Sequence, residues 1–157
     1  MSSTLEDVSL DLFKTFFAQE VVRRATAPIR EGVELALYLD QKGPVTLKRE
    51  KEGMAVHQGE PRTPDMSFWV TTKGLQSLIN HDTNDIGEIG IEIIKLMVHE
   101  DPEYKLKARV HIHTFTLLRN GYLGVLPLGG ATVMKFLASK GLTNISKIKD
   151  AISSLKG

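Results

Sequence analysis

The N-terminal part of the chain has apolar residues at helical spacing. The residues that recur every three or four positions are Val8, Leu12, Phe13, Phe16, Phe17 and Val21. Ser3 and Glu6 have the spacing of a capping box, and Pro28 follows the periodic stretch. The pattern therefore predicts one helix from about residue 4 to residue 26, ending before the proline.

The pattern then changes to strict alternation of apolar and polar residues. The four alternating runs are VELALYLD (33–40), VTLKRE (45–50), MAVHQ (54–58) and MSFWVT (66–71). They are separated by the turn-like segment 41–44, by Glu52-Gly53 and by the Pro/Gly-rich GEPRTP. Alternation is typical of strands with one apolar face, so we expect an antiparallel meander with a cover on its apolar side. Phe68 and Trp69, on adjacent positions, should point to opposite faces.

Two helices are expected next. Thr72 is placed to cap a short one, and Asp85 together with Glu88 begins a second, IGEIGIEIIKLMV (86–98). The charged residues of this second helix form one narrow stripe of Glu88, Glu92 and Lys95. A helix this apolar must be buried on most sides or must line an apolar space.

A fifth strand is predicted by YKLKARVHIH (104–113). One face carries Tyr104, Leu106, Ala108, Val110 and Ile112, and the other carries Lys105, Lys107, Arg109, His111 and His113. The stretch 111–130, HIHTFTLLRNGYLGVLPLGG, has one formal charge, and its glycines 121, 124, 129 and 130 would let it bend. Two more helical patterns follow, at 131–140 and 145–155.

Composition narrows the classes of protein. The 157 residues, 41% of them apolar, suit one globular domain spanning 1–157. A net charge of +1 argues against a dedicated nucleic-acid binder, and the absence of cysteine excludes disulfides and thiolate metal sites. The N-terminal residues do not have the pattern of a secretory signal, and no stretch reaches the roughly 18 to 20 apolar residues of a membrane span. A cytoplasmic protein is expected.

The order of these elements resembles the sterol carrier protein 2-like family, which contains the SCP-2 sterol-binding domain. The local match is DMSFWVTTKGLQSLINHDTND (65–85), an alternating strand followed by a short Leu-rich helix and a polar turn. The resemblance implies an α+β fold with a five-stranded, mostly antiparallel sheet covered on one face by helices, and an apolar cavity between them. It also implies non-catalytic binding, and transfer, of fatty acyl, sterol or phospholipid-like molecules.

The apolar segments after residue 86 have three interpretations. They are plain core, they line a lipid cavity, or they bind a partner protein or a second copy of the chain as a homodimer. For the cavity, the candidate lining residues are Ile89, Ile93, Met97, Phe115, Leu118, Tyr122, Leu123, Met134 and Leu137. No cofactor is expected.

The basic strand face also has two interpretations. Lys105, Lys107 and Arg109 either form an ordinary solvated face that protects a sheet edge, or contact an anionic headgroup or a membrane surface transiently. His111 and His113 form an H-x-H pair that zinc sites use, but no third ligand is at a useful spacing and Arg109 would repel a cation. No metal site is therefore expected.

Catalysis has no local support in the sequence. There is no G-x-S-x-G motif, and the glycine pairs of the chain lack the Lys-Ser/Thr ending of a phosphate-binding loop. A Ser-His-Asp set assembled from distant residues is not excluded by sequence. We expect a non-enzyme that binds a lipid.

Overall fold

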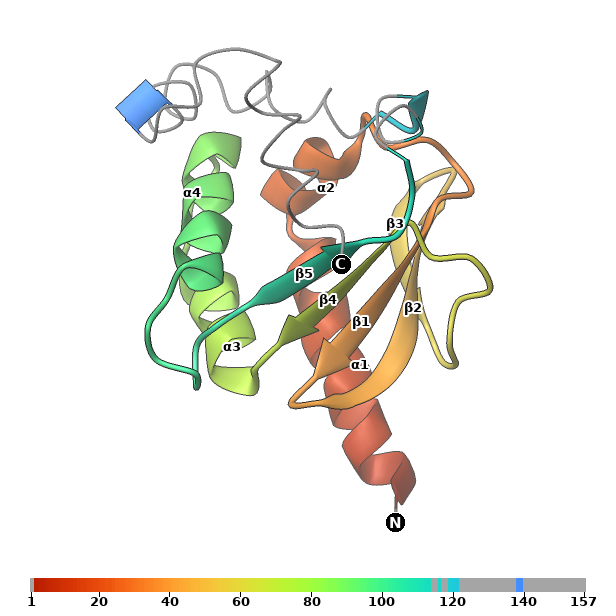
Figure 1. The fold of residues 1–157 in the computed structure, drawn as a ribbon, viewed down its shortest axis with the longest axis horizontal. Coiled ribbons are helices and arrows are strands. Elements are labelled where there is room, and N and C mark those ends of the chain that lie inside the picture. The colour runs from red at the N-terminus through yellow and green to blue at the C-terminus, as the bar shows by residue number, and fades with distance from the viewer. Residues whose placement is uncertain (1, 114–115, 117–118, 122–137, 140–157) are drawn as a thin grey trace.

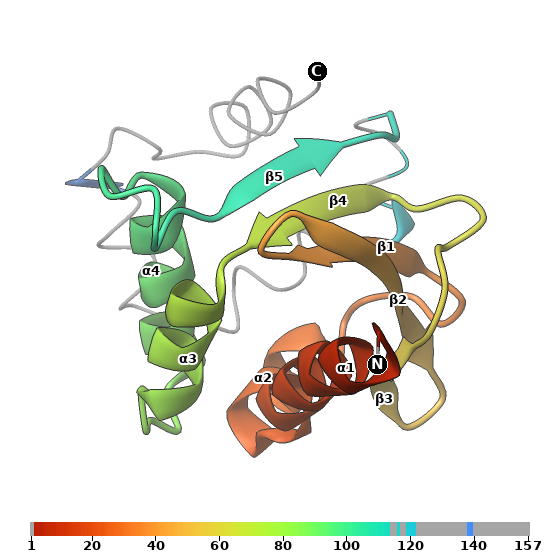
Figure 2. The same ribbon diagram turned by 90° about the horizontal axis from the view of Figure 1, so that it is seen from below.

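The alternating runs form strands and the apolar stripes form helices in the computed structural model, which describes residues 2–113, 116, 119–121 and 138–139. The described elements are α1 (Ser2–Ala18), α2 (Glu20–Thr26), β1 (Glu34–Leu39), β2 (Lys42–Glu50), β3 (Gly53–His57), β4 (Met66–Val70), α3 (Thr72–Asn80), α4 (Ile86–Met97) and β5 (Lys107–Val110). They make a five-stranded sheet with helices on one face (Figures 1 and 2). The predicted α+β class is confirmed, whereas the helices expected at 131–140 and 145–155 lie outside the described residues.

The N-terminal apolar stripe forms two helices, so the single helix expected over 4–26 is wrong at one position. Gln19 separates α1 from α2 with extended backbone angles, φ −62° and ψ 135°. Its side-chain amide donates to the carbonyl oxygen of Ile79 at 3.0 Å. The break redirects the chain so that Val21 and Val22 are buried as well as Phe13 and Phe16. The expected end before Pro28 is confirmed.

The sheet is mixed, so the predicted antiparallel meander is also wrong in part. Its strand order is β3-β2-β1-β4-β5, in which β4 pairs with β1 in parallel and all other pairs are antiparallel. The segment 58–65 is a crossover past β2 and β1 instead of a turn. It is fastened by hydrogen bonds from Thr46 Oγ1 to Gly59 O (2.8 Å) and from Asp65 N to Glu34 O (2.9 Å). As a result β1 is the central strand.

The turn between β1 and β2 is formed by Asp40 and Gln41, whereas the sequence suggested residues 41–44. Asp40 and Gln41 have positive φ values of 51° and 70°, as in the type I′ turns that suit the twist of a hairpin. The segment Gly43-Pro44 lies in β2, joined by a cis peptide bond. Asp40 also accepts a hydrogen bond from the backbone N–H of Thr72 at 2.9 Å, which links this turn to the start of α3.

Side-chain caps start the two helices of the middle segment. Thr71, and not Thr72 as predicted, caps α3: its hydroxyl oxygen accepts from the Gly74 N–H at 3.0 Å. Asp85 caps α4 as predicted, with Oδ1 accepting from the Gly87 N–H at 2.8 Å.

The hydrophobic core lies between the sheet and the helices. The strands contribute one alternating face to it, which includes Leu35, Leu37, Leu39, Leu47, Val56, Val70 and Val110. The helices contribute Phe13, Phe16, Val21, Val22, Leu75, Leu78 and Ile89, among others. Helices α1 and α2 lie beneath the sheet, and α3 and α4 stand beside them toward the β5 edge (Figure 2). No helix among the described residues covers the opposite face of the sheet (Figures 1 and 2).

Candidate functional site

Three of the predicted cavity-lining residues are described, and all lie on α4. Ile89 is buried in the core, at 3% exposure, and Ile93 and Met97 are half-buried against it. The other six, Phe115, Leu118, Tyr122, Leu123, Met134 and Leu137, lie outside the described residues. The three residues share one helix side turned toward the core.

The rest of α4 is apolar but incompletely buried. Its half-buried apolar side chains also include Ile86, Ile91 and Ile94, and Val98, directly after the helix, is 70% exposed. The helix packs against α2 and α3. A hydrogen bond from Leu106 N to Leu96 O (3.0 Å) fastens its end to the segment leading into β5. Several isoleucines on one short helix thus keep part of their surface outside the core.

The stretch after β5 is fastened to the N-terminal half of the chain at Asn120 and Gly121. Asn120 O accepts from Arg30 N at 2.8 Å, and Asn120 Nδ2 donates to the buried Asp65 carboxylate at 2.7 Å. Gly121 has φ +90°, and a Cβ there would lie 2.0 Å from Pro28 O. Glycine 121 therefore permits a close backbone approach, while glycines 124, 129 and 130, also expected to allow bending, lie outside the described residues.

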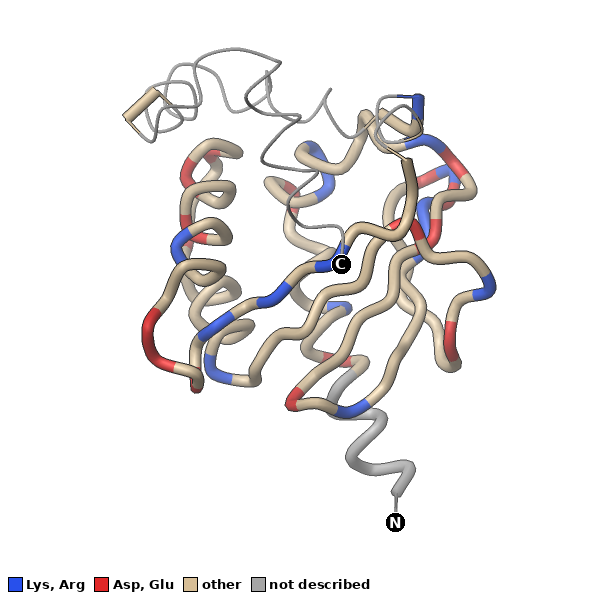
Figure 3. Tube along the Cα trace, in the orientation of Figure 1, with Lys and Arg blue, Asp and Glu red and all other residues tan. Residues whose placement is uncertain are grey.

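The predicted two-faced pattern of β5 and its flanks is confirmed. Lys105, Lys107, Arg109, His111 and His113 are exposed, and the residues between them are buried or half-buried. In the described sheet β5 is an edge strand, and basic residues follow one another along it (Figure 3). Because Leu106 and Ala108 pack on the core, the basic residues lie on the opposite face of the strand. The basic set and the α4 lining set are thus on different faces.

The aromatic side chains of Tyr38 and Trp69 lie on the same face of the sheet as the basic residues. Phe68 packs against the core, and Trp69 points to the other face, where it stacks on Tyr38 with ring centroids 4.9 Å apart and an interplanar angle of 9°. Sequence alone predicted the opposite directions of Phe68 and Trp69. It missed the pairing with Tyr38, which depends on the parallel register of β1 and β4.

A serine and a histidine also meet on this face. Ser67 Oγ lies 2.7 Å from His111 Nε2, on the neighbouring end of β5. Ser67 is only 4% exposed, and no carboxylate is found against His111 Nδ1 within the described part of the chain. A substrate would have no access to the hydroxyl, so the pair fits a structural hydrogen bond better than a nucleophile and its base.

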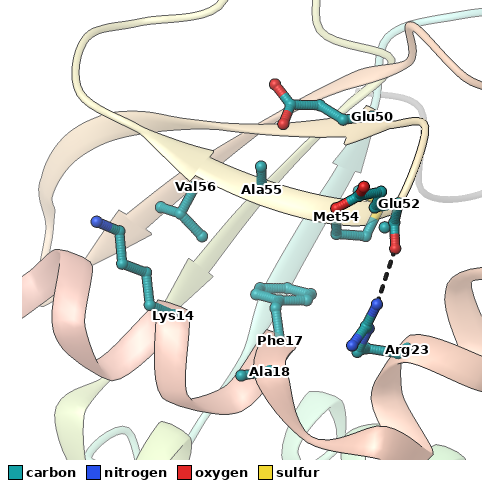
Figure 4. A pocket seen from close by; sticks show the side chains of 10 residues that line it. Lys14, Phe17, Ala18, Arg23, Glu50, Glu52, Met54, Ala55 and Val56 are labelled. Carbon is teal, nitrogen blue, oxygen red and sulfur yellow. Dashed lines mark hydrogen bonds between the residues drawn. The ribbon is translucent and has the colours of Figure 1, made fainter.

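A pocket lies at the other edge of the sheet, between α1 and β3. Its volume is about 380 Å³, with Phe17, Met54 and Val56 on its apolar wall. Charged residues surround it, and Arg23 Nη2 donates to Glu52 O at 3.0 Å (Figure 4). None of the predicted site residues that the structure describes lines this pocket. Its residues are distant in the sequence and share no motif, so only the packing of α1 against β3 brings them together.

The remaining candidate chemistry is sparse. No group of three or more His, Asp or Glu side chains is placed to hold a metal ion in the described segments. A hydrogen bond and the charge of Glu103 raise the pKa of Lys73, but both side chains are more than half exposed, as in a surface ion pair. No described helix combines the length and the apolar character needed to cross a membrane.

A comparison with solved structures shows similarity to a known protein. The chain is similar to a protein described as "UbiJ-SCP2 Ubiquinone synthesis protein", with a TM-score of 0.44 and 13% sequence identity. The alignment covers 81% of this chain and 90% of that chain. No family model and no curated protein matches the chain.

Proposed function

We propose that the chain binds a lipid-like amphipathic molecule without catalysis, with the apolar part of the ligand against α4. One observation carries this proposal: α4 is apolar apart from one narrow charged stripe, yet Ile93, Met97 and the neighbouring isoleucines are only half-buried. Such surface is costly to leave in water, at roughly 25 cal/mol per Å². A bound hydrocarbon chain would cover it.

The energetics of hydrocarbon burial support such a ligand. A chain of about 16 carbons gains on the order of 12 kcal/mol at about 0.8 kcal/mol per buried methylene. Association and ordering oppose this with about 4–15 kcal/mol. The difference is compatible with binding that is both useful and reversible, as a carrier requires. Specific polar contacts are not needed for capture.

The finer parts of the proposal concern the site and the cellular role. We place the ligand between the sheet and the helices, lined by the nine residues named from the sequence, and we propose that the protein transfers it in the cytoplasm without a cofactor. Fatty acyl, sterol and phospholipid-like ligands all fit this description. The exposed Lys105, Lys107 and Arg109 lie on the other face of β5. A contact with a membrane surface therefore suits them better than a contact with a headgroup at α4.

Two measurements test the proposal. They are native mass spectrometry of gently purified protein and uptake of a fluorescent fatty acid. We expect co-purifying lipid, saturable uptake by the wild-type chain, and roughly tenfold weaker uptake by Ile93→Asn, because a polar group would then face the hydrocarbon. Lys95→Gln, on the exposed side of α4, is the matched control and should keep wild-type uptake. Urea unfolding checks that both variants fold. A wild-type protein with neither lipid nor uptake would overturn the proposal.

Self-association through α4 is the second candidate, favoured by Val98, which is 70% exposed. It predicts a homodimer or a larger assembly whose mass rises with concentration after delipidation. Light scattering before and after lipid removal separates the two functions. A lipid-free monomer at all concentrations would contradict self-association.

A further inference from the structure

The face of the sheet opposite the core carries an aromatic pair next to a basic edge. Tyr38 of β1 and Trp69 of β4 are register partners, and Trp69 is in turn the partner of Lys107 on β5. Arg109 lies two positions further along β5, and Lys105 precedes the strand. We call Tyr38, Trp69, Lys105, Lys107 and Arg109 the aromatic–basic face. All are exposed or partly exposed.

The two rings stand upright on the sheet. Their centroids are 4.9 Å apart, which is close to the spacing of about 4.8 Å between neighbouring strands, and their planes are within 9° of parallel. Rings lying flat side by side could not approach so closely. The rings therefore turn their faces toward each other and their edges outward. An upright indole or phenol presents an apolar body with a polar tip, the combination found at membrane–water interfaces.

The surroundings of the rings are consistent with a docking face. Ala36, Thr46 and Ser67 beside them are buried, and Thr46 and Ser67 are hydrogen-bonded to Gly59 and His111. The exposed part of the aromatic–basic face is therefore made of the two rings and the neighbouring residues of β5 and its flanks. On the β5 side, the exposed Lys105 and Lys107 carry positive charge and point the same way. Positive charge next to aromatic edges is complementary to a surface with an anionic outer layer and an apolar interior.

We propose that the aromatic–basic face docks the protein on an anionic membrane surface. Trp69 and Tyr38 enter the interfacial layer, and Lys105 and Lys107 lie against the lipid phosphates and carboxylates. Each basic residue near such a surface strengthens binding by roughly fivefold at low salt. This docking is independent of a ligand at α4, because the two sites lie on opposite faces of β5.

The upright rings favour a membrane over single-stranded nucleic acid. Proteins that bind single strands on a sheet stack bases on open aromatic faces. Here one face of each ring is already occupied by the other ring. The chain also has a net charge of only +1, without the large basic excess of such proteins.

Trp69 is the only tryptophan of the chain, so its fluorescence reports on this face alone. The full-length protein is titrated with phosphatidylcholine vesicles, with vesicles containing phosphatidylserine, and with the latter carrying brominated acyl chains. We expect a blue shift and quenching by the brominated lipid only when phosphatidylserine is present, both weakening as salt rises. Sedimentation with vesicles measures binding without the fluorophore.

Two variants with equal charge change sharpen the test. Lys105→Gln/Lys107→Gln should weaken vesicle binding at least roughly tenfold, whereas Lys14→Gln/Lys51→Gln, away from this face, should leave it unchanged. Trp69→Phe should bind more weakly in sedimentation. Urea unfolding shows whether each variant folds.

Three outcomes would overturn membrane docking by this face. They are the absence of vesicle binding, binding with unchanged Trp69 emission, and emission that responds to single-stranded polyuridylate but not to vesicles. Uptake of fluorescent fatty acid, measured without vesicles, is a separate readout. If the wild-type protein binds vesicles through this face but takes up no fatty acid, only the lipid-binding function proposed above is overturned.

Discussion

At the scale of single residues, Gly121 shows how one position fixes a segment. Its φ of +90° and the close approach of Pro28 O leave no room for a side chain. Asn120 beside it bonds to Asp65 and to the backbone of Arg30. These contacts join the stretch after β5 to the loop after α2. A glycine expected to allow bending thus belongs to a close contact in the folded chain.

The substitution Gly121→Ala should therefore be strongly destabilising. The positive φ alone costs about 1–3 kcal/mol for a residue with a Cβ, and the overlap with Pro28 O adds to that. Gly32→Ala is the matched control, since Gly32 has φ +95° and a Cβ there would meet no atom within 4 Å. Urea unfolding measures both. Equal losses would contradict the close approach at Gly121.

At the scale of elements, the start of α3 depends on its cap. Thr71 Oγ1 accepts from Gly74 N, and Asp40 of the β1–β2 turn accepts from Thr72 N. Two elements thus fix the entry into a short helix whose buried residues are Gly74, Leu75 and Leu78. Gly74 itself packs closely on the backbone of Tyr104, because a Cβ there would lie 2.9 Å from Tyr104 O.

Removing this cap should lower the free energy of unfolding. Thr71→Ala is expected to cost about 1 kcal/mol, the usual size of an N-cap contribution. Thr71→Ser keeps the hydroxyl oxygen and should recover most of the loss. Thermal or urea unfolding measures the difference. Equal stability of the Ala and Ser variants would mean that the hydroxyl does not cap the helix.

At the scale of the whole molecule, the proposed ligand site and the aromatic–basic face are separated by β5. Leu106 and Ala108 pack toward the core, whereas Lys105 and Lys107 point away from it. The separation follows from the two-residue period of a strand. A single edge strand can therefore serve two surfaces whose effects are independent.

We accordingly expect the two activities to be lost separately. Ile93→Asn should weaken fatty acid uptake and leave vesicle binding intact, and Lys105→Gln/Lys107→Gln should have the reverse effect. Distant, independent sites give additive free-energy changes, so the combined variant should show both losses in full. Fluorescence and sedimentation titrations of all three proteins measure this. Loss of both activities in either parent variant would argue for one shared surface.

Local patterns predicted the elements of the fold well. The alternation of β5 placed Lys107 and Val110 on the correct faces, and Asp85 was correctly identified as the cap of α4. The break at Gln19 was missed because an apolar stripe continues through it. The role of Thr71 was missed because adjacent threonines are equivalent until the backbone geometry distinguishes them.

The candidate sites were predicted less completely, because they depend on contacts between distant residues. The lining residues on α4 were predicted from the helical pattern and the family resemblance and remain a prediction, whereas the pocket between α1 and β3 has no sequence signal. The stack of Tyr38 on Trp69 was missed for the same reason. It requires β4 to lie beside β1, whereas the order of the runs suggested that β4 would lie beside β3.

The sequence by itself determined the periods of the chain: where it is helical, where it alternates, and which side of each element is apolar. These are local properties, since the direction of a side chain follows from the backbone period and burial follows from its apolar surface. Only the tertiary structure decided which strands are neighbours and which residues meet across them. Pairing depends on the crossover at 58–65 and on packing of the helices against one face, and both are set by contacts between residues far apart in the chain.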